Sequence, residues 1–332
     1  MDKVQFPYRA ASHLILLHVI AESGAWEKHG VDVNYDFQIS SSDAHGKVPT
    51  HEVEFVGGNH VSTYAARAHG DTWVYLGQTV NHVHNALVVR KDSGMNSVAD
   101  IRGKKLATSG AHPMLNDWLF LKQNGLDKDR DDYEMIKTVA YKKDAMDPVE
   151  KFGGAAKKVP LWQWVADKRA DACFVTPPAT LFAKDAGLKV IDLDPFPMIW
   201  FTTISSSLTF VEKNPDLVQR FLKGIIEGIH FFKTQRDKSI KIIEERYTRD
   251  GKLDHAKATI AYDSLAPLLS TRLFPQLDSI SNVYQEAVYK DKDALKVNPM
   301  ELWDFHHVRK IADTGFVDNL YGESRGNGKA HA

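Results

Sequence analysis

The stretch "VEFVGGNH", residues 53–60, ends in side chains that can bind an anion or transfer a proton. Two glycines let a backbone approach a ligand closely, and the segment after them has the spacing of a helix. The N–H groups and the dipole at a helix start favour an anion. We therefore expect ligand contacts from the residues around this turn: Gly58, Asn59, His60 and Ser62. The alternative is that Asn59 or Ser62 only caps the helix.

A second candidate lies at the end of the first expected strand, "KVQFPY", where Tyr8 is followed by Arg9. An arginine at this place can form a bidentate pair with a carboxylate, a sulfonate or a sulfinate. The other interpretation is a solvated arginine at a strand end. We expect both Tyr8 and Arg9 to contact a small-molecule ligand.

The segment "GQTVNHVHNALVV" carries several polar residues just before an expected crossover strand. Thr79, Asn81 and His82 are expected to contact the ligand. His82 and His84 would face one side of an extended strand, and a neutral imidazole suits acid–base chemistry near pH 7. If the protein is an enzyme, the candidate catalytic residues are His60, His82 and His84.

As an alternative, the same three histidines could together bind a metal ion. The chain contains 15 histidines, however, so one His-x-His pair carries little information. The one cysteine, Cys173, excludes an internal disulfide and a multi-cysteine metal site. We expect no metal and no cofactor, and we interpret Cys173 as a buried thiol in an apolar strand.

Further ligand contacts are expected from the middle of the chain. "SGAHPM" presents Ser109, Gly110 and His112 at another helix start, where backbone N–H groups favour an anion. "VTPPAT" places Thr176 at a strand end, and its two prolines fix the turn. Trp200 lies on an expected strand, where its ring can stack on an aromatic ligand. The common nucleotide, zinc-protease and serine-hydrolase motifs do not occur.

The elements that must position these side chains alternate between strand and helix. The pattern restarts at Lys91, and after Ser207 amphipathic helices follow one another. This order predicts an α/β fold with mostly parallel sheets and a helical C-terminal segment. We expect one lobe from residues 1–90 plus 205–332 and a second lobe inserted as residues 91–204. Strand ends of the two lobes would then face each other across a cleft.

Composition narrows the class of protein. The chain has 332 residues and a formal net charge of -1, so no global field favours nucleic acid or an anionic membrane. The start, "MDKVQFPYRA", lacks the apolar core of a signal peptide, and "HLILLHVIAESGAW" is too short to span a bilayer. We expect no membrane insertion and a cytoplasmic location for the chain as written, or a periplasmic one if it is a processed form. Both a monomer and a dimer fit.

Five ordered segments resemble a known family. "AESGAWEKHGVDVNY" is similar to a motif of type II periplasmic-binding-protein folds, more narrowly the branch of nitrate-, sulfonate- and taurine-binding proteins and thiamine-pyrimidine synthases (NMT1/THI5-like). "HEVEFVGGNHVSTYAARAHGD" resembles the same branch, although His51 and Glu54 stand where the branch has Gly and Asp. The other three are "VVRKDSGMNSVADIRGKKLATSG", "DKRADACFVTPPATLFAKDAG" and "FVEKNPDLVQRFLKGIIEGIHF". The resemblance implies a two-lobe fold that closes on a small solute.

The resemblance leaves the function open between a receptor and an enzyme, because this scaffold hosts both. An aromatic sulfinate desulfinase on this scaffold uses a cysteine at the end of its first strand, where this chain has Tyr8 and Arg9. The cysteine-rich run of fungal pyrimidine synthases is also missing. We favour binding of a small organic acid, with aromatic and heterocyclic acids among the candidates, and with an ABC-transporter permease as partner if the protein is exported. The alternative is a lyase or hydrolase that uses the cleft histidines.

Overall fold

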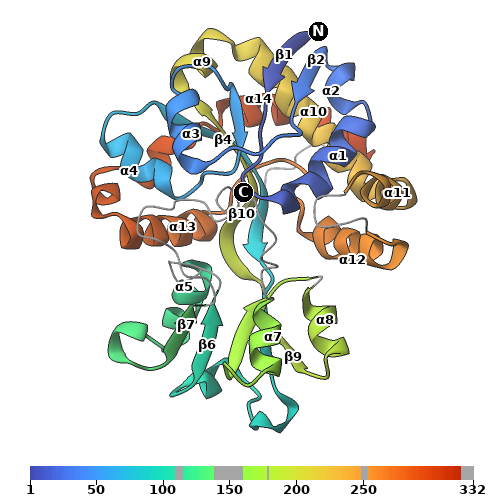
Figure 1. Cartoon of the computed structure of the whole chain (residues 1–332). Helices are drawn as coiled ribbons and strands as arrows, with labels where there is room; N and C mark the ends of the chain where they lie inside the picture. Colours follow the sequence, from blue (N-terminus) through green and yellow to red (C-terminus); the bar gives the residue numbers. More distant parts are fainter. Residues whose placement is uncertain (109–114, 138–159, 178, 248–252, 323–332) are drawn as a thin grey trace, which may run out of the picture. The chain divides into compact units, whose positions relative to one another are not determined.

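The computed structural model describes residues 1–108, 115–137, 160–177, 179–247 and 253–322. The chain divides into two compact units, drawn in Figure 1. Unit 1 comprises Met1–Asn81 and Ile199–Ala332, and unit 2 comprises His82–Met198. The chain passes between the units within two long strands, β4 (Trp73–Val83) and β10 (Phe196–Ser207).

The first segment of unit 1 supplies short strands and the helices between them. These elements are β1 (Asp2–Gln5), α1 (Leu14–Glu22), α2 (Ala25–Lys28), β2 (Val31–Asn34), α3 (Ser41–Lys47), β3 (Phe55–Gly57) and α4 (Ser62–Ala68). Strands β1 and β2 pair in parallel, while β3, β10 and β4 form a second sheet in that order. Tyr8 forms isolated parallel bridges to both Gln38 and Gly57. The residue after Tyr8 is therefore held next to the end of β3.

The second segment of unit 1 supplies helices after β10. They are α9 (Leu208–Lys213), α10 (Pro215–Thr234), α11 (Arg236–Arg246), α12 (His255–Leu265), α13 (Leu277–Lys290), α14 (His306–Asp313) and α15 (Phe316–Tyr321). Helix α10 has an apolar stripe and packs against α1 and α2. This packing ties the two distant segments of the chain into one core.

Unit 2 is built on one five-stranded sheet of order β7-β6-β8-β5-β9. Its elements are β5 (Ala86–Val89), β6 (Lys105–Thr108), α5 (Leu115–Gln123), β7 (Glu134–Lys137), α7 (Leu161–Ala166), β8 (Ala172–Val175), α8 (Ala179–Asp185) and β9 (Lys189–Asp192). Strand β6 runs parallel to β7 and β8, whereas β5 runs antiparallel to β8 and β9.

The sheets are thus mixed, which corrects the prediction that they are mostly parallel. Besides the two antiparallel pairs of β5, strand β10 also pairs antiparallel with β3. The reason lies in the connections. A helical crossover returns the chain in the parallel direction, but only two 3-10 turns, Lys91–Ser93 and Val98–Ile101, lie between β5 and the next strand of the same sheet, β6. Alternation of helices and strands therefore could not fix the direction of β5.

In the turn after β3, neither Asn59 nor Ser62 only caps the following helix, which was the alternative interpretation of the sequence. Helix α4 begins at Ser62, its N-cap is Val61, and no side chain caps it. Asn59 and Ser62 are hydrogen-bonded to other side chains instead. The capping role that would explain these two residues by local structure alone is therefore not observed.

The core of unit 1 is closely packed where α10 crosses the first helices. The ring of Phe221 stacks on Phe55 at 4.0 Å between centroids and on Trp26 at 6.0 Å. A Cβ on Gly224 would lie 2.3 Å from Trp26 Cδ1, and one on Gly228 would lie 2.6 Å from Ile20 Cγ1. Glycine is required at both positions because the helices approach so closely.

We expect Gly228→Ala to lower the free energy of unfolding by about 1–2 kcal/mol, since overpacking costs more than alanine gains in helix propensity. The matched control is Gly46→Ala, because a Cβ at Gly46 of α3 meets nothing within 4 Å. That variant should be stabilised by up to about 1 kcal/mol. Urea unfolding of both variants measures the difference, and equal effects would show that α10 does not pack as described.

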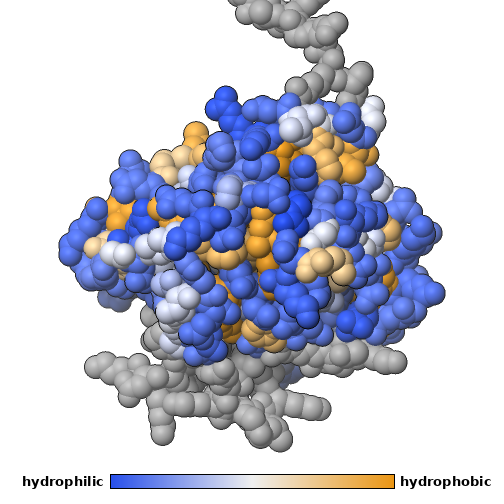
Figure 2. Space-filling view, turned by 90° about the horizontal axis from the view of Figure 1, so that it is seen from above, coloured by the Kyte–Doolittle hydropathy of each residue, from blue (hydrophilic) through white to orange (hydrophobic). Residues whose placement is uncertain are grey.

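The face shown in Figure 2 is mostly hydrophilic, with small apolar areas among the polar ones. Within the described ranges, no helix is long and apolar enough to cross a membrane.

Candidate functional site

Strand β1 ends at Gln5, earlier than the sequence predicted, and the segment that follows it lies against the turn after β3 in unit 1. The Arg9 backbone N–H donates to the Gly57 carbonyl at 3.2 Å. Gly58 donates to the Thr203 carbonyl at 2.7 Å and accepts a hydrogen bond from Ser205 Oγ at 2.6 Å. These bonds fix the backbone of the "GGNH" turn on strand β10.

The Arg9 side chain extends over this turn. Gly58 has a φ of 125°, and a Cβ on it would lie 2.7 Å from Arg9 Cγ. The guanidinium donates to the carbonyl of Ile39. The sequence predicted a close approach of this turn to a ligand, whereas the group that approaches Gly58 in the structure is the Arg9 side chain.

Four basic side chains of unit 1 influence one another electrostatically, and we call them the basic cluster: Arg9, His13, His60 and Lys290. Burial, followed by the charges of Arg9 and Lys290, lowers the pKa of His60 to about 4. Burial, followed by His60 and Arg9, lowers the pKa of His13 to about 3. Lost hydration and the charge of Arg9 also lower the pKa of Lys290. At pH 7 both imidazoles are therefore neutral, and the positive charge resides on Arg9 and Lys290.

Hydrogen bonds determine which nitrogen of His60 carries the proton. Gln78 Nε2 lies 2.5 Å and 2.6 Å from the carbonyls of Val80 and Trp200, so it is the donor end of the amide. Gln78 Oε1 consequently accepts from the Thr203 hydroxyl at 2.7 Å. The Thr203 oxygen is then an acceptor for His60 Nδ1, 3.3 Å away. His60 thus carries its proton on Nδ1 and has a lone pair on Nε2.

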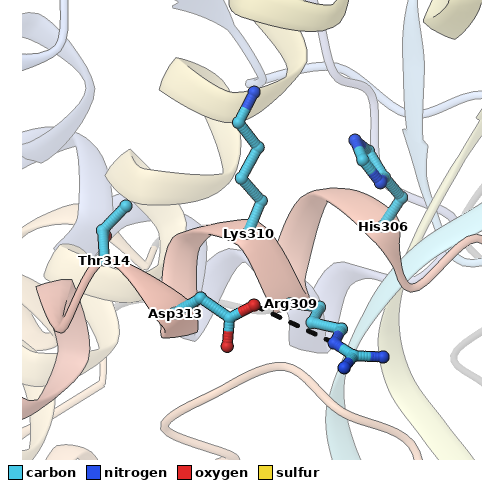
Figure 3. A pocket seen from close by; sticks show the side chains of 5 residues that line it. All are labelled: His306, Arg309, Lys310, Asp313 and Thr314. Carbon is cyan, nitrogen blue, oxygen red and sulfur yellow. Dashed lines mark ion pairs between the residues drawn. The ribbon is translucent and has the colours of Figure 1, made fainter.

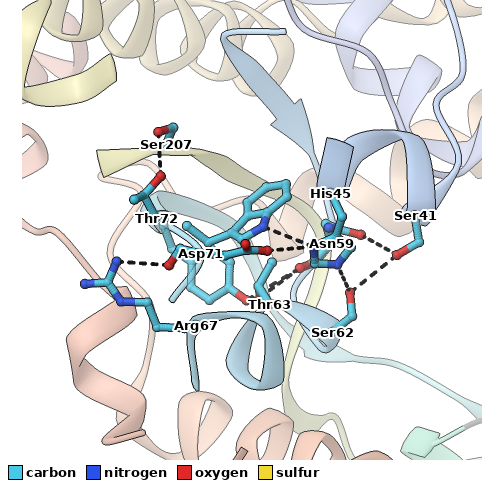
Figure 4. A network of polar contacts seen from close by, with 11 residues as sticks. Ser41, His45, Asn59, Ser62, Thr63, Arg67, Asp71, Thr72 and Ser207 are labelled. Atoms are coloured by element: carbon cyan, nitrogen blue, oxygen red, sulfur yellow. Dashed lines mark hydrogen bonds and ion pairs between the residues drawn. The ribbon is translucent and has the colours of Figure 1, made fainter. Parts of the chain in front are cut away.

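Asn59 combines a strained backbone with an unpaired donor. Its φ of 68° lies in the left-handed region, which asparagine tolerates better than most residues. Its carbonyl accepts from Thr63 Oγ1 at 3.1 Å, and its Oδ1 accepts from Ser41 Oγ at 3.0 Å (Figure 4). Its Nδ2 is buried and has no hydrogen-bond partner in the described part of the chain. A buried N–H group without a partner is costly, and an oxyanion is a suitable acceptor for it.

Four other predicted residues of unit 1 make contacts within that unit. Thr79 Oγ1 donates to the Thr202 carbonyl at 2.7 Å. The Asn81 amide donates to the Phe274 carbonyl and accepts from the Gln276 N–H, which holds the start of α13. Two further predicted residues pack in or against the core of this unit: Tyr8 and Trp200.

The predicted residues of unit 2 are not gathered in one described cluster. His82 lies near the end of β4, and His84 follows that strand and is exposed, so the two do not share one strand face. Thr176 follows β8, and its carbonyl accepts from the Ala179 N–H at the start of α8. Three predicted residues lie outside the described residues: Ser109, Gly110 and His112. The described residues contain no group of three or more His, Cys, Asp or Glu that could hold a metal ion.

Several residues of the site do not stand out in the sequence. His13 and His45 lie outside the segments with recognisable site motifs, and Lys290 is far from Arg9 in the sequence. Ser41 and Thr203 carry no motif. A basic residue just after Arg9, such as His13, was the one local signal that could have been used.

A surface depression along α14 is the pocket drawn in Figure 3, and its lining residues are His306, Arg309, Lys310, Asp313 and Thr314. All five are exposed, and Arg309 forms an ion pair of 3.9 Å with Asp313. These residues follow one face of a single helix. The depression is explained as a solvated helix face and does not contain any residue of the basic cluster.

The buried histidines make stability depend on pH. The pKa of His13 is about 3 in the folded protein and about 6.5 when unfolded, so the unfolded chain binds more protons below pH 6.5. The free energy of unfolding should therefore fall as pH drops from 7 to 5, with a slope that approaches about 1.4 kcal/mol per pH unit for each such histidine well below its unfolded pKa. His13→Gln should reduce this slope by the contribution of one histidine. Urea unfolding at several pH values measures the slope. An unchanged slope would contradict the burial of a neutral His13.

Comparison with known proteins places this chain in a family. The NMT1/THI5 like family profile matches residues 12–239. A search of curated protein sequences finds no match. Three solved structures illustrate the shared fold, and each is less than 25% identical to this chain.

A putative sulfonate ABC transporter protein, the periplasmic sulfonate-binding protein SsuA from Methylobacillus flagellatus KT, is 17% identical, with a TM-score of 0.67 over 100% of this chain and 99% of that one. The periplasmic aliphatic sulphonate binding protein SsuA from Escherichia coli is 16% identical, with a TM-score of 0.65 over 97% and 99% of the two chains. A variant of the enzyme DszB in complex with biphenyl-2-sulfinic acid is 16% identical, with a TM-score of 0.62 over 94% and 99%. The fold is that of type II periplasmic binding proteins, and the chain belongs to the NMT1/THI5 like family.

Proposed function

We propose that this protein binds a small organic anion at the basic cluster, through a sulfonate, sulfinate or carboxylate group. The observation that carries the proposal is the buried, unpaired Nδ2 of Asn59 on the same turn as His60, whose pKa is lowered by burial and then by the charges of Arg9 and Lys290. Arg9 and Lys290 supply the charge, and Asn59 supplies a directed donor. An anion there would offset the repulsion between the two cations.

The relatives support this class of ligand. Two of the similar structures are sulfonate-binding proteins, and a third holds an aromatic sulfinic acid. We extend the proposal to two lobes, residues 1–90 plus 205–332 and residues 91–204, that close on the ligand. In that closed state further contacts come from the remaining predicted residues, namely Tyr8, Gly58, Ser62, Thr79, Asn81, His82, Ser109, Gly110, His112, Thr176 and Trp200. If the protein is exported, an ABC-transporter permease is the proposed partner.

A second candidate function rests on His60. Its Nε2 carries a lone pair and could accept a proton from a substrate, as a lyase or hydrolase on the same scaffold would require. However, a general base works best with a pKa near the operating pH, and the pKa of His60 is about 4. By the sequence resemblance, Tyr8 and Arg9 stand where the desulfinase has its cysteine, so that nucleophile is missing at this place. Binding therefore fits this site better than catalysis.

The test is incubation of the purified protein with a panel of alkyl and aryl sulfonates, sulfinates and carboxylates. Thermal unfolding reports binding, and mass spectrometry reports whether each compound is recovered unchanged. A ligand at 100 times its Kd should stabilise the protein by about 2.7 kcal/mol and be recovered intact. A compound that is consumed over many turnovers, with loss of turnover in His60→Gln, would instead establish the enzyme. A panel with no stabilising anion would contradict the proposed function.

A further inference from the structure

A chain of hydrogen bonds leads from a buried tryptophan to Asn59. Trp73 Nε1 lies 3.1 Å from His45 Nδ1, and His45 Nε2 lies 2.9 Å from Ser62 Oγ. Ser62 Oγ lies 3.4 Å from Ser41 Oγ, which lies 3.0 Å from Asn59 Oδ1. Figure 4 shows His45, Ser62, Ser41 and Asn59 converging from α3, from the turn after β3 and from the start of α4. We call these five side chains the relay.

The Trp73 indole determines which atom is the donor in each hydrogen bond of the relay. An indole N–H can only donate, so His45 Nδ1 must be the acceptor. Burial lowers the pKa of His45, against the opposite effect of the Asp71 carboxylate, whose Oδ2 lies 3.7 Å from Nδ1. The lowered pKa favours the neutral ring, and its proton is then on Nε2. Nε2 donates to Ser62, Ser62 donates to Ser41, and Ser41 donates to Asn59. The Asn59 atom that receives this last bond must therefore be the oxygen.

The relay consequently fixes the orientation of the Asn59 amide. Its oxygen is held by Ser41, and both hydrogens of Nδ2 remain for another acceptor, although this nitrogen is buried and lacks a partner among the described residues. The backbone of Asn59 cannot compensate by turning, because its carbonyl is held by Thr63.

We propose that the relay makes the site selective for ligands that present only hydrogen-bond acceptors to Asn59, with His45 as a positioning residue that acts through Ser62 and Ser41. This inference rests on the proposed function. The oxygens of a sulfonate can accept hydrogen bonds from the fixed Asn59 Nδ2. The matching sulfonamide instead brings its own N–H donors towards Nδ2, and both donor groups then lack an acceptor. Sites that hydrogen-bond one partner reject the mismatched one strongly for this reason.

The test compares Kd values of a sulfonate and its sulfonamide, using benzenesulfonate and benzenesulfonamide or the best sulfonate of the panel. Ser41→Ala frees Asn59 to turn over, so the sulfonamide-to-sulfonate Kd ratio should fall at least about tenfold. His45→Phe should do the same. His45→Gln should keep the wild-type ratio, because its oxygen can accept from Trp73 while its nitrogen donates to Ser62. Ser42→Ala is the matched control, since Ser42 contacts Ser40 and lies outside the relay.

A ligand-independent measurement separates failure of the relay from failure of the proposed function. The carbon-13 resonance of Asn59 Cγ, assigned by its loss in Asn59→Asp, reports the hydrogen bond to Oδ1. It should shift in Ser41→Ala and His45→Phe and stay unchanged in His45→Gln and Ser42→Ala. An unmoved resonance in the first two variants, or an unchanged Kd ratio in a protein that binds the sulfonate, would overturn the relay. A shifted resonance without any bound anion would support the relay and contradict the proposed function.

Discussion

Replacing Arg9 by glutamine is expected to weaken the binding of an organic sulfonate by about a hundredfold or more. Charge-assisted hydrogen bonds contribute about 1.5–3 kcal/mol each, and a buried charge that loses its partner costs about 2–5 kcal/mol. Arg9 is the cation that acts on both His13 and His60, so its removal lowers the positive potential of the whole basic cluster. Isothermal titration calorimetry at pH 7 measures the change in Kd.

Arg67→Gln is the matched control for that experiment. Arg67 is in the same unit, on α4, and donates to the Asp71 carbonyl at 3.4 Å. It is not among the causes of the lowered pKa of His60. Its replacement should leave Kd within about a factor of two. Similar losses in both variants would mean that general charge, and not Arg9, attracts the anion.

The second large effect is expected from Gly58→Ala. The φ of 125° is strained for alanine, and the added Cβ would meet Arg9 Cγ at 2.7 Å and His13 Cε1 at 3.5 Å. Backbone strain and overpacking together should lower the free energy of unfolding by about 2–4 kcal/mol. Displacement of Arg9 should also weaken anion binding, so stability and affinity fall together. Urea unfolding and calorimetry of the same preparation measure both.

The control for Gly58→Ala must also place alanine at a positive φ, but without the contact to Arg9. Gly24 provides it, because its φ is 69° and a Cβ there meets nothing within 4 Å. Gly24→Ala should cost about 1–2 kcal/mol and leave anion affinity unchanged. If Gly58→Ala costs no more than Gly24→Ala and binds the anion normally, Arg9 does not lie on Gly58 as described.

Two of the candidate positions could be predicted from the sequence because polar or charged residues follow apolar strands there. The turn with Asn59 and His60 stood out because two glycines precede polar residues, and Arg9 stood out because a charged residue ends an apolar strand. The structure places these three side chains in one unit. The family resemblance, which rested on five ordered segments, is confirmed by the match over residues 12–239.

Residues that act through distant contacts could not be found in this way. Lys290 joins the basic cluster from the end of α13, and Thr203 orients His60 from β10. His45 acts on Asn59 only through two serines. None of these pairs has a spacing in the sequence that a helix or strand period could reveal. The same limit applies to β5, whose antiparallel pairing with β8 and β9 follows from no local pattern of its own residues.

The most direct test of the central claim is the number of protons taken up when an organic sulfonate binds. A sulfonate does not titrate between pH 5 and pH 8, so uptake reports the protein. The pKa of His60 is about 4 without a ligand, and an anion beside it should raise that value. We expect calorimetry in buffers of different ionisation enthalpy to show net proton uptake at pH 5, little at pH 8, and a marked loss of uptake in His60→Gln. Binding with no proton uptake at pH 5, or with full uptake in His60→Gln, would contradict an anion site at the basic cluster.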